Sequence, residues 1–87
     1  MMPTIDMMPT IDMIATGKNI RAMRIAAGMT IDAVAETCGV SRGAVAKWQR
    51  GDCMPTIDNM IILAFAWNVK VDDIIVVINR KQAISVA

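Results

Sequence analysis

Apolar residues recur at intervals of three and four through most of the chain, which is the period of an amphipathic helix. The clearest case is the stretch 31–38, where one apolar stripe is formed by Ile31, Val34, Ala35 and Cys38. We expect this stripe to pack on a core, with Cys38 acting as a buried apolar residue. The same periodicity predicts five helices, at about residues 16–27, 31–38, 41–50, 57–67 and 71–77.

The predicted helices begin and end at residues that favour helix termini. A serine or threonine can accept hydrogen bonds from the free N–H groups of a first turn, and glycine adopts the left-handed conformation in which many helices end. The starts are assigned to Thr30, Ser41 and Thr56, and the ends to Gly28, Gly39 and Gly51.

The N-terminus is a tandem repeat: residues 1–6 and 7–12 both read MMPTID, and MPTID returns at 54–58. In the third copy Thr56 can cap a helix, because Pro55 prevents helix before it. The first two copies lack such a continuation and each could bury little, so we expect an irregular, flexible arm over 1–15. The alternatives for the first two copies are a short extended segment and a product of translation from an upstream start codon.

The chain length allows one domain. At 87 residues the core is small, and such cores are usually only marginally stable without a partner, a metal or a crosslink. We expect a helical domain at 16–78 and a short tail at 79–87, with strand-like character around 83–86. The predicted fold class is all-α, with five helices, an N-terminal arm and a C-terminal tail.

Composition excludes several classes of protein. Hydrophobic residues make up 55% of the chain, yet the longest apolar run, 60–67, is far shorter than the roughly 18 residues of a membrane span. Aspartates and prolines occupy the N-terminus, where an export signal needs a basic start and an unbroken apolar run. Two cysteines and no histidine argue against a disulfide framework or a zinc cluster. We therefore expect a cytoplasmic protein without metal, cofactor or membrane, and the apolar surplus favours self-association.

The basic residues are concentrated in one part of the chain. The formal net charge is only +1, but residues 18–50 carry six basic and two acidic residues, whereas the segments on either side are slightly acidic. A surface that faces phosphates requires such a concentration.

The basic segment contains two helices joined by a short turn at Gly39, which is the helix-turn-helix arrangement. Projection of 41–50 at 100° per residue puts Ala44, Val45 and Trp48 on the core side. The opposite, cationic face consists of Arg42, Gly43, Ala46, Lys47 and Arg50, with Gln49 at its edge.

This face suits double-stranded DNA. The forked guanidinium of Arg42 can bond two acceptors of guanine, Lys47 can reach bases or phosphates, and the amide of Gln49 can read adenine. We expect phosphate contacts from Arg50, Lys18 and Arg21. The alternative for the first-helix cations, which include Arg24, is an ordinary solvated charged face.

The segments GMTIDAVAETCGVSRGAVAKWQRG and MPTIDNMIILAFAWNVKVDDII resemble the XRE family of phage Cro and repressor-like helix-turn-helix proteins. The resemblance covers about residues 17–78. It implies a five-helix domain that binds operator DNA as a dimer and represses transcription. The chain departs from the family at Ile31, where relatives often have a glutamine that touches the DNA backbone, and in the small residues at the centre of the recognition helix. Specificity can then depend on DNA shape and on the arm.

The fourth helix suggests a dimer interface. Ile62 and Phe65 stand where relatives have charged residues, and neither belongs to the core stripe that we predict from Ile57, Ile61 and Ala64. We expect a homodimer interface made of Ile62, Phe65, Ile74, Val77 and Ile78.

The sequence also bears on two other classes of function. An enzyme is not expected, since histidine and tyrosine are absent, no phosphate-binding glycine loop occurs and the chain is too short for a substrate cleft. The competing hypothesis is an antitoxin or phage regulatory subunit that acts mainly by holding a protein partner.

Overall fold

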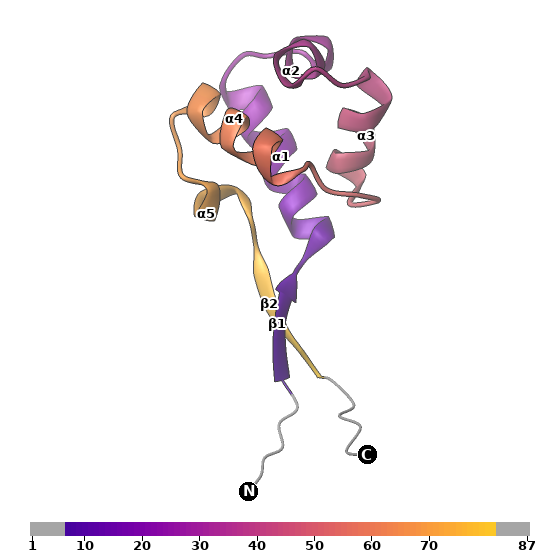
Figure 1. The fold of residues 1–87 in the computed structure, drawn as a ribbon, viewed down its shortest axis with the longest axis vertical. Coiled ribbons are helices and arrows are strands. Elements are labelled where there is room, and N and C mark those ends of the chain that lie inside the picture. The colour runs from indigo at the N-terminus through magenta and orange to yellow at the C-terminus, as the bar shows by residue number, and fades with distance from the viewer. Residues whose placement is uncertain (1–6, 82–87) are drawn as a thin grey trace, which may run out of the picture.

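The computed structural model describes residues 7–81. Its elements are β1 (Met7–Ile11), α1 (Met13–Ala26), α2 (Ile31–Cys38), α3 (Arg42–Arg50), α4 (Ile57–Trp67), α5 (Val71–Ile74) and β2 (Val77–Lys81). The five helices gather into one body, and the two strands leave it together as a narrow ribbon (Figure 1). The prediction of five helices is confirmed. Within residues 7–81, no helix is long and apolar enough to cross a membrane.

Side chains cap the starts of four helices, as the sequence predicts for three of them. The side-chain oxygens of Asp12, Thr30, Ser41 and Thr56 each accept a hydrogen bond from the backbone N–H three residues ahead, at 3.0 to 3.2 Å. Each such cap is typically worth about 1 kcal/mol. At the other ends, α2 and α3 stop at left-handed glycines, Gly39 and Gly51, where a side chain would be strained.

The core forms where the inner faces of the helices meet. Its largest fully buried apolar side chains are Ile20, Val34, Val45, Met60, Leu63 and Ile74. Trp48 is 3% exposed, which confirms its predicted place in the core. Burial of one such aliphatic side chain stabilises a fold by about 1.5–3 kcal/mol, so this cluster holds α1, α2, α3 and α4 together.

The predicted core stripe of α4 is right at Ala64 but wrong at Ile57 and Ile61. Met60, Leu63 and Ala64 are buried, whereas Ile57 and Ile61 are 70% and 54% exposed. Because α4 is apolar on nearly every side, periodicity alone could not decide which face turns inward. The contacts of the neighbouring helices decide it.

The arm and the end of the fifth helix also differ from prediction. Residues 7–11 form a strand instead of an irregular arm, and they pair antiparallel with β2 in the register Met7↔Lys81 to Ile11↔Val77. Helix α1 begins at Met13 rather than near Thr16, and α5 ends at Ile74 rather than near Val77. Local periodicity cannot detect a partner strand so distant in sequence. The arm residues 1–6 and the strand-like stretch 83–86 lie outside the described residues.

Hydrogen bonds join the N-terminal part of α1 to residues 74–76, the segment that leads into β2. The N–H of Asp12 donates to the carbonyl of Val76 at 2.8 Å, and the N–H of Val76 donates to Oγ1 of the buried Thr16 at 2.9 Å. Asn19 Nδ2 donates to the carbonyl of Ile74 at 3.2 Å. The start of α1 is therefore fixed against the segment that leads into β2.

Candidate nucleic-acid interface

Helices α2 and α3 form the helix-turn-helix. After the left-handed Gly39, Val40 donates its N–H to the carbonyl of Ala35, and Ser41 returns to extended backbone before α3 starts. Val45 and Trp48 then anchor α3 in the core. Helix α3 lies at the edge of the helical body (Figure 1), so its far side is free for a ligand.

The outward side of α3 is the cationic face expected from the sequence. Arg42, Gly43, Lys47 and Arg50 are exposed, and Ala46 is half-buried. We call these five residues the α3 face. A side chain at Gly43 would meet only the Ser41 hydroxyl, at 3.7 Å, so the centre of the face is low and open.

Two exposed ion pairs border the α3 face. Arg42 Nε lies 3.3 Å from a carboxylate oxygen of Asp32, and Arg50 Nε lies 2.9 Å from one of Asp52. All four side chains are more than half exposed, and such surface pairs contribute between about 0 and 1 kcal/mol. Both arginines can therefore exchange their carboxylate for a phosphate or a base at little cost.

Gln49, which we predicted to read adenine, is held by α1 in this structure. It is half-buried, and its Oε1 accepts a hydrogen bond from Arg24 Nε at 2.8 Å. Reading adenine requires the donor and the acceptor of the amide together. With its acceptor engaged by α1, Gln49 has only its N–H groups to offer.

Arg24 was grouped with Lys18 and Arg21 as a surface cation, but it joins three parts of the fold. Besides bonding Gln49, it donates Nη1 to the carbonyl of Met29 at 2.8 Å, so one guanidinium ties α1 to α3 and to the loop before α2. Lys18 and Arg21, by contrast, are exposed on α1 as expected. Nothing in the local pattern separates Arg24 from its two neighbours.

Gly17 lets α1 lie close against α3. A Cβ at this position would come within 2.8 Å of the Gln49 carbonyl oxygen, which is backbone and cannot move aside easily. A glycine inside a predicted helix was the signal available in the sequence. The backbone of α1 therefore lies directly against the C-terminal turn of α3.

The structure revises the set of residues predicted for dimerisation. Phe65 is 88% exposed, and Ile62, Val77 and Ile78 are also exposed. Ile74 is completely buried in the core and cannot contact a partner. Ile57 and Ile61, predicted as core, are instead exposed on the same side of α4 as Ile62 and Phe65. We call these four residues the α4 face.

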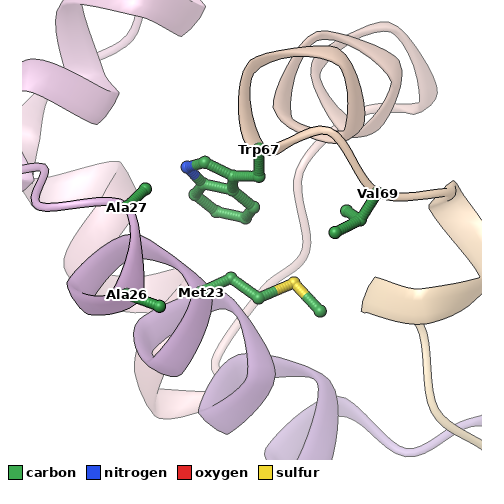
Figure 2. Close-up of a pocket in the computed structure, with 5 residues that line it drawn as sticks. All are labelled: Met23, Ala26, Ala27, Trp67 and Val69. Carbon is green, nitrogen blue, oxygen red and sulfur yellow. The ribbon is translucent and has the colours of Figure 1, made fainter.

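An apolar pocket of about 180 Å³ lies away from these two faces, between α1 and the turn after α4. Figure 2 shows Trp67 and Val69 facing Met23, Ala26 and Ala27 across it. The indole N–H of Trp67 donates to the sulfur of Met29 at 3.3 Å, so the one polar group of the lining is already bonded. The side chains that line the pocket are thus apolar, apart from an indole N–H that is already hydrogen-bonded.

The cysteines are both half-buried free thiols. Burial raises the pKa of the Cys38 thiol, which keeps it protonated and unreactive at neutral pH. This agrees with the predicted packing role of Cys38.

Comparison with solved structures finds relatives of the same architecture. The restriction-modification controller protein C.AhdI from Aeromonas hydrophila aligns with a TM-score of 0.65 and 25% identity, over 72% of this chain and 96% of that one. The P22 c2 repressor protein, solved with a synthetic operator, aligns with a TM-score of 0.61 and 30% identity, over 66% and 86%. The clp gene regulator ClgR from C. glutamicum aligns with a TM-score of 0.62 and 26% identity, over 70% and 79%.

A search by sequence among curated proteins finds no significant match. The helix-turn-helix family HTH_3, however, matches residues 20–74, which span more than half of the chain and include all of α2, α3, α4 and α5. The chain therefore belongs to this helix-turn-helix family, the XRE family of Cro and repressor-like proteins.

Proposed function

We propose that this protein is a sequence-specific, double-stranded DNA-binding transcriptional regulator that acts as a homodimeric repressor. The observation that carries the proposal is the α3 face: exposed cations around a low centre, on a helix whose other side is locked in the core by Val45 and Trp48. Family membership supports it, as does the likeness to the P22 c2 repressor, which was solved with a synthetic operator. Such a regulator would act in the cytoplasm, where its DNA would lie.

Each residue of the α3 face has a defined role in the proposed DNA contact. Recognition helices read bases mainly with their N-terminal residues, and Arg42 is the first residue of α3. Its guanidinium would bond O6 and N7 of one guanine. Gly43 and Ala46 would let the helix backbone approach the groove floor, while Lys47 and Arg50 would hold phosphates.

Exposed cations on α1 would extend the contact. Lys18 and Arg21 would bind the DNA backbone beside α3; both are exposed, and α1 packs closely against α3 at Gly17. Contacts of this kind carry no sequence information but set the position of the protein on the duplex.

The proposed dimer uses the α4 face. Four exposed apolar side chains on one helix form a patch of the kind that monomeric proteins rarely leave open. Two copies joined there would present two α3 helices, and a spacing of about 34 Å between them would match successive major grooves. Val77 and Ile78, on the ribbon, would add to the interface if the ribbon of one subunit packs beside the α4 face of the other.

Salt-dependent binding tests the proposal. A duplex selected from a random pool should bind with an affinity that falls with salt at a log–log slope of roughly −5, as for a dimer that neutralises about six phosphates. Lys70→Ala, which removes an exposed cation outside the α3 face, should leave the slope unchanged. A flat salt dependence would remove the basis of the proposal.

A second candidate is an antitoxin or phage regulatory subunit whose main ligand is another protein. The exposed α4 face favours it, because such a face can hold a different chain as well as a second copy. Duplex binding measured with and without a partner protein distinguishes the two functions. Binding to the selected duplex only after the partner is added fits the second candidate.

A further inference from the structure

Arg24 is held by neutral acceptors only. Its two hydrogen bonds go to the amide oxygen of Gln49 and to the backbone carbonyl of Met29, each at 2.8 Å. The ion pairs between described side chains are Arg42–Asp32 and Arg50–Asp52, and neither includes Arg24. The guanidinium is always protonated in proteins, so it keeps a full positive charge at the junction of α1 and α3.

The position of this charge matters for DNA. Lys18, Arg21 and Arg24 follow one another at three-residue spacing along α1, and Gln49 lies at the edge of the α3 face. Arg24 is half-buried and therefore still within reach of solvent. A guanidinium has five N–H donors, and two are engaged here, so about three remain for a phosphate.

We propose that Arg24 is part of the DNA-binding surface, and that Gln49 is a positioning residue that keeps its charge available to a phosphate by being neutral. Gln49 fixes the direction of the guanidinium with one hydrogen bond and does not cancel its charge. A glutamate at position 49 would accept the same hydrogen bond as an ion pair. It would bind Arg24 more tightly and would neutralise the charge of its guanidinium. The inference rests on the proposed function, since it assigns a residue to the same DNA contact.

The amide thus favours DNA binding over stability. Replacement by the isosteric acid, Gln49→Glu, should move the two properties in opposite directions, which a merely structural role would not do. We expect the thermal midpoint to rise by roughly 3 °C, because a half-buried charged pair replaces a neutral hydrogen bond. DNA affinity should fall about five-fold per subunit at physiological salt, and the salt slope should weaken by about one per subunit.

Two variants serve as controls. Asn79→Asp makes the same amide-to-acid change at an exposed position of β2, on the ribbon far from α3 (Figure 1), and should leave the salt slope nearly unchanged. In an Arg24→Met background, Gln49→Glu should lose its stabilising effect, because the cation that it pairs with is gone.

The test uses thermal unfolding and salt titration of duplex binding on the full chain and the selected duplex. A more stable Gln49→Glu protein with weaker, less salt-sensitive binding supports the proposal. Equal affinity and slope in Gln49→Glu and the unaltered protein overturn it while leaving the proposed function intact. If the unaltered protein does not bind any duplex in a salt-dependent way, the proposed function falls and this inference falls with it.

Discussion

Helices α3 and α4 begin and end in similar ways but expose opposite chemistry. Each is capped by a hydroxyl, Ser41 or Thr56, and each ends at a left-handed residue, Gly51 or Asn68. Each buries one side in the same core. The outward side of α3 is cationic and low at its centre, whereas that of α4 is apolar.

The difference shows how one small core can support two surfaces. Exposed arginine and lysine side chains are well solvated in the free protein, so the α3 face can stay open to solvent at little cost in free energy. Exposed isoleucines and a phenylalanine, by contrast, gain about 25 cal/mol per Å² when they are covered. The α4 face is therefore expected to be covered permanently and the α3 face only when DNA is present.

The largest effect is expected from charging the α4 face. Ile61→Glu combined with Phe65→Glu should give monomers in light scattering, because two buried carboxylates per subunit would face each other across the interface. Duplex affinity should drop by at least about 100-fold, since the second half-site is no longer bound intramolecularly. Ile25→Glu, at a similarly exposed apolar site on α1, is the matched control and should stay dimeric. A dimer that survives the double substitution would place the interface elsewhere.

The next largest effect is expected from the α3 face. Arg42→Ala should weaken binding about 10-fold or more for the selected duplex and reduce its preference over a scrambled one, because a bidentate base contact is worth about 1–3 kcal/mol. Arg50→Ala should weaken both duplexes about equally, as the loss of a phosphate contact does. If neither substitution changes the affinity, DNA contacts a different part of the protein.

Smaller effects are expected from removing the N-terminal caps of α3 and α4. Ser41→Ala and Thr56→Ala should each lower the free energy of unfolding by about 1 kcal/mol, because each removes the acceptor for one N–H of a first turn. Only Ser41→Ala should also weaken duplex binding, since it loosens the start of the helix that carries Arg42. Equal losses of affinity in the two variants would mean that α3 has no special part in binding.

The pentapeptide MPTID shows what the sequence could and could not predict. At 54–58 its threonine caps α4, as local rules predict, but at 8–12 the same residues form most of β1 and the aspartate caps α1. The starts of α2, α3 and α4 and the left-handed ends of α2 and α3 follow from residues close in sequence, and the sequence predicts them. The pairing of β1 with β2 depends on residues some 70 positions away, and no local pattern contains that information.

The same distinction applies to the candidate site. The cationic face of α3 follows from the helical period and from the burial of Val45 and Trp48, so the sequence predicts it. The contact of Arg24 with Gln49 joins two helices through side chains, and their packing had to be known first. The inward face of α4 could not be predicted for a related reason, because several of its sides are apolar enough to be buried.

In the proposed function, α3 is the helix that contacts DNA. The most direct test of this contact is a titration of isotope-labelled protein with the selected duplex, followed through the backbone amide resonances. We expect the largest shifts in 41–50 and smaller ones near Lys18 and Arg21, with α4 and the ribbon almost unchanged. Shifts concentrated on α4 or on β2, with those of Arg42, Gly43 and Lys47 unmoved, would contradict it.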